Sequence, residues 1–475
     1  MPRATSTSTS TGTFDNPMLK RPVNTMLFKM AGPISIGMLS TFLFQIVDTY
    51  FVGQLGANEL AALAFSASIY LLLVSLFMGV SVGVSSVVAR LYGAGLEGQA
   101  RALISAVLLF VAVLSVMLTQ IASLMTHATF ALLGASGEVL VLTVTYMDIL
   151  YASFPLLMLG IVGSGAVRAI GVTKQTEIIF AIAGIINLVF DYFLIFGIGP
   201  FPALGLAGAA WATALSFAFI ALGVGGILIR HRLLGLPILS GLLSSIKDLA
   251  KMVVPTVAMQ ILIPVTGMII TVLLAGTGPE AVAAYGVAAR IEALALIGIF
   301  AVGMAVTPFI AQNMGADAHD RIDEAIIFAG KASIYMGSLL FIGLFFAGSW
   351  LAQIFSDDAQ IIQLVGLYFK IIALSYGFVG ILNVTIAIFN GLQLSVTSLK
   401  IMCVRTFIIT IPLIIIGAYF GVVWLLIGLA AGNILAALYA ARMMKRSLVK
   451  WNRALANASP IADIIADIKK LFGQR

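Results

Sequence analysis

The stretch MLFKMAGPISIGMLSTFLFQIVDTYFVGQL, residues 26–55, is apolar apart from a lysine near its start, a few small polar groups and one acid, Asp48. At 1.5 Å per residue, a helix of this length exceeds the roughly 30 Å thickness of the hydrocarbon core of a bilayer. The stretch therefore predicts a membrane-spanning helix. Burying a carboxylate in such a helix costs several kcal/mol unless something compensates, so Asp48 is a candidate functional residue.

The composition extends this prediction to the whole chain. Of 475 residues, 61% are hydrophobic and only 9% are charged, with a mean hydropathy of +1.12. Soluble domains carry roughly 25% charged residues, so we predict an all-α, polytopic membrane protein. The single cysteine, Cys403, excludes a disulfide framework or a cysteine metal cluster, and we expect no cofactor.

Apolar runs long enough to cross a bilayer occur twelve times. They lie near residues 26–52, 60–89, 103–126, 140–167, 177–198, 205–230, 249–275, 282–310, 325–349, 361–388, 401–420 and 422–444. An even number of spans places both termini on the same side of the membrane.

Lysine and arginine gather in alternate connections between these runs. Lys20 and Arg21 precede the first run, and Arg90 and Arg101 follow the second. Lys400 and Arg405 follow the tenth run, and further basic residues fill 442–453. By the positive-inside rule, these connections and both termini are cytoplasmic in a multi-pass protein of the cell (inner) membrane. The basic residues thus have a topological explanation, and no nucleic-acid partner is expected.

The two halves of the chain resemble each other at an offset of 222 residues. Met252 falls on Met30, Pro255 on Pro33, and the segment AQNMGA (311–316) on ARLYGA (89–94). Since six spans restore the starting side, the halves are predicted to be parallel repeats, two six-helix bundles with a substrate path between them.

This division predicts five segments along the chain. They are a disordered cytoplasmic tail (1–25), an N-terminal six-helix lobe (26–230), a cytoplasmic linker (231–248), a C-terminal six-helix lobe (249–446) and a cytoplasmic tail (447–475). In the last segment, Ser459 and Pro460 open an amphipathic run that predicts a helix on the membrane surface.

Four of the nineteen acids fall within predicted spans, and three of these are in the first half. We interpret Asp148 as a solvated acid at the membrane interface. We expect Glu292 either to form a charge pair with Arg290 or to link two helices. The repeat places apolar or basic residues opposite the first-half acids Asp48, Asp148 and Asp191: Ile270, Lys370 and Leu413. The asymmetry assigns ion chemistry to the first half.

Asp191 has Asn187 one helical turn before it on the same face. Oxygen ligands of this kind suit H⁺ or Na⁺ better than a transition metal. The alternative is that Asp191 only ties its helix to a neighbour. Pro33 removes a backbone hydrogen bond about four turns from Asp48, so bending there would be coupled to Asp48 protonation unless the kink is fixed.

Several motifs together resemble the multidrug and toxic compound extrusion (MATE) family over residues 25–446. They are VDTYFVGQLGANELAA (47–62), ARLYGAG (89–95), NLVFDYFLIFG (187–197) and GLAGAAWATALS (205–216), combined with the internal repeat. The resemblance implies a V-shaped pair of six-helix bundles, acting without enzymatic activity as an antiporter. Such a protein exports cationic or amphipathic drugs in exchange for H⁺ or Na⁺.

The resemblance is to the DinF-like branch, because the acids that the NorM-like branch carries in spans seven and ten are missing. It implies a proline-dependent bend at Pro33 and a coupling site formed by Asp48, Tyr146, Asn187, Asp191 and Thr213. Four residues of this coupling site would also hold Na⁺, namely Asp48, Asn187, Asp191 and Thr213. Ion binding would neutralise the acids, reshape the first-lobe cavity and expel the drug.

Residues on the same helix faces as the two acids are candidates for the substrate cavity: Met38, Thr41, Gln45, Phe180 and Gly184. Drugs and membrane lipids are the expected partners, and we expect a monomer. The sequence lacks a P-loop, so no ATP-driven pump is predicted. One alternative is a flippase for a lipid-linked saccharide, which would need several basic residues at a lateral opening. A second is a membrane-embedded enzyme or receptor, for which no catalytic set or signalling domain is present.

Overall fold

A computed structural model describes residues 16–236 and 239–450, which are helical without any strand. Twelve helical segments of 19 to 37 residues are long and apolar enough to cross a membrane. The predicted all-α fold with twelve spans is confirmed, with bounds that differ by a few residues. The expected amphipathic helix after Pro460 lies outside the described residues.

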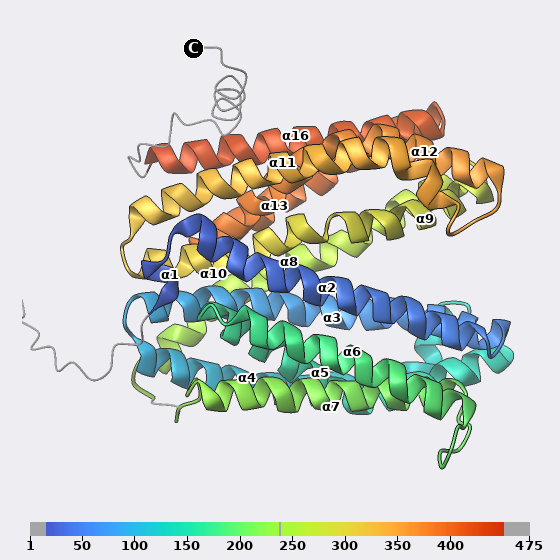
Figure 1. Cartoon of the computed structure of the whole chain (residues 1–475), viewed down its shortest axis with the longest axis horizontal. Coiled ribbons are helices and arrows are strands. Elements are labelled where there is room, and N and C mark those ends of the chain that lie inside the picture. Colours follow the sequence, from blue (N-terminus) through green and yellow to red (C-terminus); the bar gives the residue numbers. More distant parts are fainter. Residues whose placement is uncertain (1–15, 237–238, 451–475) are drawn as a thin grey trace, which may run out of the picture.

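The first half forms one lobe of six uninterrupted helices, shown in blue to green in the lower part of Figure 1. These are α2 (Val23–Gly53), α3 (Ala57–Gly93), α4 (Glu97–Leu132), α5 (Gly137–Ala169), α6 (Thr173–Phe196) and α7 (Leu206–Arg230). Pro33 and Pro155 lie inside α2 and α5 without ending either helix. Helix α5 is buried along most of its length because it packs against α3, α4 and α7.

The second half also crosses the membrane six times, but three of its spans are interrupted. The continuous helices are α8 (Leu239–Ala275), α11 (His319–Ala352) and α16 (Val422–Lys450). The others are α9 (Pro279–Ala295) with α10 (Ile297–Gly315), α12 (Ala359–Ile372) with α13 (Tyr376–Gly391), and α14 (Ser395–Cys403) with α15 (Ile411–Tyr419). A 3₁₀ turn at Ala373–Ser375 joins the second pair, and a π-helical segment at Val404–Thr410 joins the third.

Pro412, the second residue of α15, explains the π-helical segment. Proline has no N–H and its ring clashes with the carbonyl group four residues earlier, so the backbone just before it widens. The breaks at Leu296 and at Ala373–Ser375 have no proline beside them. The runs predicted at 282–310, 361–388 and 401–420 therefore each contain a break in the α-helix.

The expected tail and linker also need correction. Residues 16–25 are ordered: Asn16 accepts a hydrogen bond from the Met18 backbone N–H and caps the short helix α1 (Pro17–Lys20). Met18 is fully buried, and its carbonyl oxygen accepts a hydrogen bond of 2.9 Å from Arg321 on α11. At the middle of the chain, α8 begins at Leu239, within the segment expected to be linker.

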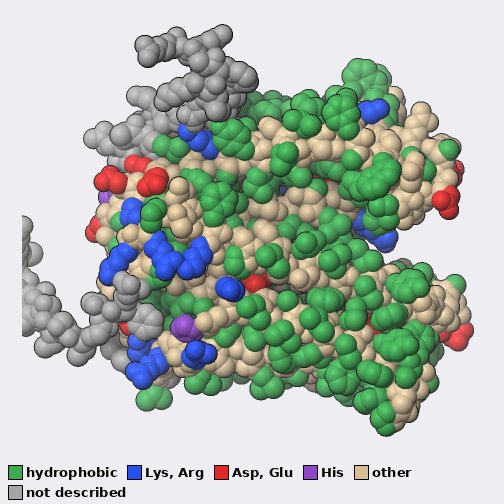
Figure 2. Space-filling model, viewed as in Figure 1, with side chains coloured by type: hydrophobic (Ala, Val, Ile, Leu, Met, Phe, Trp, Pro, Cys, Tyr) green, Lys and Arg blue, Asp and Glu red, His purple; other side chains and the backbone are tan. Residues whose placement is uncertain are grey.

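Contacts between the lobes gather at one end of the molecule. Ser86 on α3 donates a hydrogen bond to the carbonyl oxygen of Asn390 on α13, and Arg90 bonds to Gln393. From the other lobe, Gln312 on α10 donates to the carbonyl oxygen of Ala169. Lysine and arginine side chains cluster at this end in Figure 2, whereas the lobes separate around a notch at the opposite end.

Candidate functional site

A cavity of about 600 Å³ lies in the first lobe and is bounded mainly by α2, α3, α5, α6 and α7. Such a volume accommodates a drug-sized molecule. Helices α2 and α6 pack side by side, and each contributes one of the candidate acids. Most of the lining is apolar, with a small number of polar groups at its two ends.

One face of α6 supplies a row of residues along this cavity. Its members recur at intervals of three and four positions, which places them on the same side of a helix: Glu177, Phe180, Gly184, Asn187 and Asp191. All except Asp191 line the cavity, and Asp191 is fully buried behind the lining. The helical period therefore explains how a single span reaches both ends of the cavity.

The carboxyl groups of Asp48 and Asp191 lie close to each other. Neither has a hydrogen to offer the other unless one is protonated. Oδ1 of Asp48 and both oxygens of Asp191 are buried and receive no hydrogen bond from any N–H or O–H group of the described residues. Two such groups favour binding a shared proton or a small cation, because both ionised forms together are strongly disfavoured.

The amide and hydroxyl groups expected beside the acids are also present. Asn187 donates a hydrogen bond of 3.2 Å to the hydroxyl of Thr213 on α7. Tyr146 on α5 is buried near Thr213 and near both acids. The structure thus brings together all five residues of the predicted coupling site, although it does not test their role.

All five predicted cavity residues, Met38, Thr41, Gln45, Phe180 and Gly184, line the cavity. Gly184 has a further role, because a Cβ atom there would collide with the ring of Phe44 on α2. A glycine at this position allows α2 and α6 to approach closely. Pro33 precedes the lining residue Ile34 and does not itself line the cavity.

Three ionisable residues that line this cavity were not predicted as site residues. Tyr70 on α3 lies close to Asp48. At the other end of the cavity, Arg168 is 7% exposed and donates a hydrogen bond of 2.9 Å to the Ser81 hydroxyl. Glu177 lies near Arg168 and faces Gly37 on α2. Glu177 shares its helix face with Asn187 and Asp191, and that spacing could have identified it.

The two remaining acids within the spans have different surroundings. Asp148 is exposed and accepts hydrogen bonds of 3.1 and 3.3 Å from Ser123 and Thr126 on α4, in agreement with an interfacial acid. Glu292 on α9 accepts a hydrogen bond from the hydroxyl of Tyr368 on α12. It therefore ties two helices together, whereas the expected pair with Arg290 is absent from the salt bridges of the described residues.

The profile of the MatE family matches residues 33–193 and 255–416 of this chain. Together these two segments cover more than half of the sequence, and each begins at one of the repeat-related prolines, Pro33 and Pro255. The chain belongs to the MatE family. Its members are transporters rather than enzymes, as predicted.

Two characterised relatives within the MatE family align over most of this chain. A protein of Shewanella oneidensis called FAD transporter is 34% identical over 423 residues, which are 88% of this chain and 93% of the relative. The Multidrug export protein MepA of Staphylococcus aureus (strain bovine RF122 / ET3-1) is 26% identical over 437 residues, 89% of this chain and 93% of the relative.

A solved MatE-family structure shows the same fold. The MATE transporter VcmN of Vibrio cholerae in the bent form superposes with a TM-score of 0.85 at 27% identity, covering 90% of this chain and 98% of that chain. A mutant form of the same transporter superposes with a TM-score of 0.86. These comparisons confirm a transporter built from two six-helix lobes.

Proposed function

We propose that this protein is a secondary antiporter that exports cationic or amphipathic compounds in exchange for H⁺ or Na⁺. The observation that carries the proposal is the pair of buried carboxyl groups, Asp48 and Asp191, at the edge of a large, mostly apolar cavity. A cavity of that kind binds apolar substrates, and the acids supply an ion-dependent charge within it.

Coupling follows from competition between the ion and a cationic substrate for the same charge. When a proton or Na⁺ neutralises the carboxyl pair, the cavity loses its attraction for a cation, and the substrate is released. When the ion leaves, the negative charge is restored. Exchange requires that each ligand favours a different conformation, so we assign the ion to the state that releases substrate.

The basic end of the molecule is proposed to face the cytoplasm, with both termini on that side. The clustering of lysine and arginine at this end supports the assignment, because cytoplasmic connections are enriched in these residues. The hydrogen bonds from Ser86 and Gln312 close the interface between the lobes at the same end. In this orientation the conformation faces outward, with the notch of Figure 2 open to the exterior.

Flavin nucleotide export is a second candidate function, because the relative at 34% identity is called FAD transporter. One cavity residue suits an anionic substrate, since Arg168 is buried at the end opposite Asp48, although Glu177 lies beside it. A lipid-linked saccharide flippase is less well supported, because Arg168 is the only lysine or arginine among the described residues that line the cavity.

Everted membrane vesicles test the main proposal. Vesicles that contain the protein are compared with vesicles that contain Asp48→Asn or Asp191→Asn for uptake of a fluorescent lipophilic cation, which corresponds to export from the cell, under a pH gradient or a Na⁺ gradient. We expect one gradient to drive transport in the wild type and both variants to lose it while the protein remains in the membrane. Gradient-driven transport by Asp48→Asn at the wild-type rate would disprove the coupling role.

Substrate class is resolved in the same vesicles by supplying FAD in the external medium in place of the cation. Gradient-driven movement of FAD, without movement of the cation, would replace the multidrug proposal by the second candidate. Movement of both would define a broader substrate range. The carboxyl variants serve as controls in either case, because they lack the proposed ion site.

A further inference from the structure

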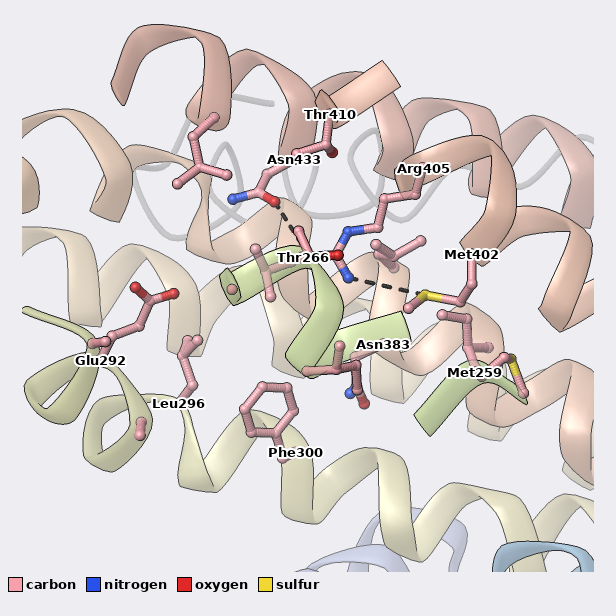
Figure 3. Close-up of a pocket in the computed structure, with 18 of the residues that line it drawn as sticks. Met259, Thr266, Glu292, Leu296, Phe300, Asn383, Met402, Arg405, Thr410 and Asn433 are labelled. Carbon is pink, nitrogen blue, oxygen red and sulfur yellow. Dashed lines mark hydrogen bonds between the residues drawn. The ribbon is translucent and has the colours of Figure 1, made fainter. Parts of the chain in front are cut away.

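A second cavity of about 430 Å³ lies in the other lobe, among α8, α9, α12, α13, the π-helical segment and α16. Its polar residues stand at separate places on the wall. Figure 3 shows Glu292 on one side and Arg405 on the other, with Asn433 and Thr266 between them. The two lobes therefore contain different cavities, and only the first has a pair of acids.

Arg405 has few partners for a charged group inside a membrane protein. A guanidinium carries five N–H donors. The described contacts of Arg405 are one hydrogen bond of 3.5 Å to the amide oxygen of Asn433 and one of 3.9 Å to the sulfur of Met402. Both are long and both acceptors are neutral, so neither compensates the cost of burying the charge.

The nearest candidate counter-ion is engaged elsewhere. Glu292 accepts the hydrogen bond from Tyr368, and it forms no salt bridge with Arg405 in the described part of the chain. Asn433 is also committed, because its amide nitrogen donates a hydrogen bond of 3.1 Å to Ser375. The guanidinium thus interacts with the charge of Glu292 only across the cavity, and it has no anionic partner within salt-bridge distance among the described residues.

The local backbone holds Arg405 in this position. The residue lies within the π-helical segment Val404–Thr410, which Pro412 induces. Segments of this type are uncommon and occur often at functional sites. The 3₁₀ turn Ala373–Ser375 supports the neighbouring wall, because the Ser375 hydroxyl accepts a hydrogen bond from the lining residue Asn433.

We propose that this second cavity is a binding site for an organic anion, whose phosphate, sulfonate or carboxylate group pairs with Arg405. The planar guanidinium binds such oxyanions through two parallel hydrogen bonds. The rest of the ligand lies along the apolar wall toward Phe300 and Leu296, which Figure 3 places below the polar groups. The site is independent of ion coupling in the first lobe.

Equilibrium binding to the purified full-length protein in a neutral detergent tests this site with two probes that differ only in charge. We expect 1-naphthyl phosphate to bind the wild type at least about tenfold more tightly than 1-naphthol. Arg405→Gln should remove this preference and leave 1-naphthol binding unchanged. Arg405→Lys should retain part of it, because the ammonium keeps the charge without the two-pronged geometry.

Two further variants locate the effect. Arg290→Gln is a matched control on the exposed surface of the same lobe and should keep the full preference for phosphate. Arg168→Gln alters the first-lobe cavity and should also keep it. A preference that is lost in Arg168→Gln but survives in Arg405→Gln would overturn the proposal, as would equal binding of both probes to the wild type.

Folding and the source of the anion are tested separately. Size-exclusion profiles and melting temperatures show whether Arg405→Gln is folded. If it is not, the proposal is judged on whether Arg405→Lys has a smaller preference for 1-naphthyl phosphate than the wild type. Dihexanoyl phosphatidylglycerol is then added as a competitor. Displacement of 1-naphthyl phosphate by this lipid supports the site with a lipid headgroup as its natural ligand. Failure to displace it supports the site with a soluble organic anion.

Discussion

Gly93 and Gly315 occupy equivalent positions in the two repeats, and each lies against the backbone of the other lobe. A Cβ atom at Gly93 would collide with the carbonyl oxygen of Gln312, and one at Gly315 with the carbonyl oxygen of Arg90. Arg90 and Gln312 are themselves related by the 222-residue offset. The lobes therefore meet at the basic end through one contact made twice, in opposite directions, around a pseudo-twofold axis.

Gly93→Ala is expected to weaken closure at this end. The added methyl group pushes against backbone atoms that cannot move aside, so the lobes separate more often. Ser86→Cys in a Cys403→Ser background places a near-isosteric thiol in this contact, where Ser86 is fully buried. Maleimide labelling of that thiol should become several-fold faster with Gly93→Ala.

Gly98→Ala is the matched control, because a Cβ atom at Gly98 meets nothing within 4 Å. Its labelling rate should equal that of the parent. Equal labelling of the Gly93→Ala and Gly98→Ala proteins would show that the contact at Gly93 does not hold the lobes together.

Gly184→Val should separate α2 from α6, because the ring of Phe44 occupies the space that the new side chain needs. Overpacking of this kind costs about 1–3 kcal/mol, which predicts a lower melting temperature. The shift would also part Asp48 from Asp191 and reduce gradient-driven transport. Gly225→Val on α7 is the control, since a Cβ atom there has open space. A melting temperature of Gly184→Val equal to that control would contradict the prediction.

Glu177→Gln is expected to weaken binding of cationic substrates. The change keeps the size of the side chain but removes the negative charge beside Arg168, so that end of the first-lobe cavity becomes more positive. Apparent KM for a monovalent cation should rise about tenfold, which corresponds to about 1.4 kcal/mol, while KM for a neutral substrate stays within twofold. A rise of equal size for both substrates would indicate a structural defect instead.

Arg321→Gln should release α1 from the surface of the second lobe. Arg321 donates hydrogen bonds to the carbonyl oxygens of Met18 and Arg21, and another of 2.9 Å to the side chain of Asn313. Trypsin cleavage after Lys20 should become faster in this variant, as followed by mass spectrometry of the N-terminal fragment. The cleavage rate of Arg321→Lys should lie between the rates of the wild type and Arg321→Gln. An unchanged cleavage rate would mean that other contacts hold α1 in place.

The sequence was sufficient for the number of spans, the repeat and the grouping of the first-lobe residues. Hydropathy reports long apolar helices directly, and the helical period places Asn187 and Asp191 on one face. Glu177 was missed for a definite reason: the predicted span began at 177, so this acid was counted as a span end. Helix α6 in fact begins at Thr173, which puts Glu177 inside it.

The second-lobe site was less accessible to sequence reasoning. The break at Leu296 and the 3₁₀ turn at Ala373–Ser375 occur within long, mostly apolar runs and have no proline beside them. Arg405 was read as a topology signal, because it follows the tenth apolar run like other basic residues. Only the packing of α16 and the π-helical segment shows that its side chain lines a cavity.

Helix α2 packs against both lobes and so links them mechanically. Its first half, with Met26, Met30 and Ile34, is buried in the core of the second lobe beside α10, whereas its second half packs on α6 next to the carboxyl pair. Any movement of Asp48 relative to the second-lobe core must be absorbed along α2 between Ile34 and Asp48, over about 20 Å of helix.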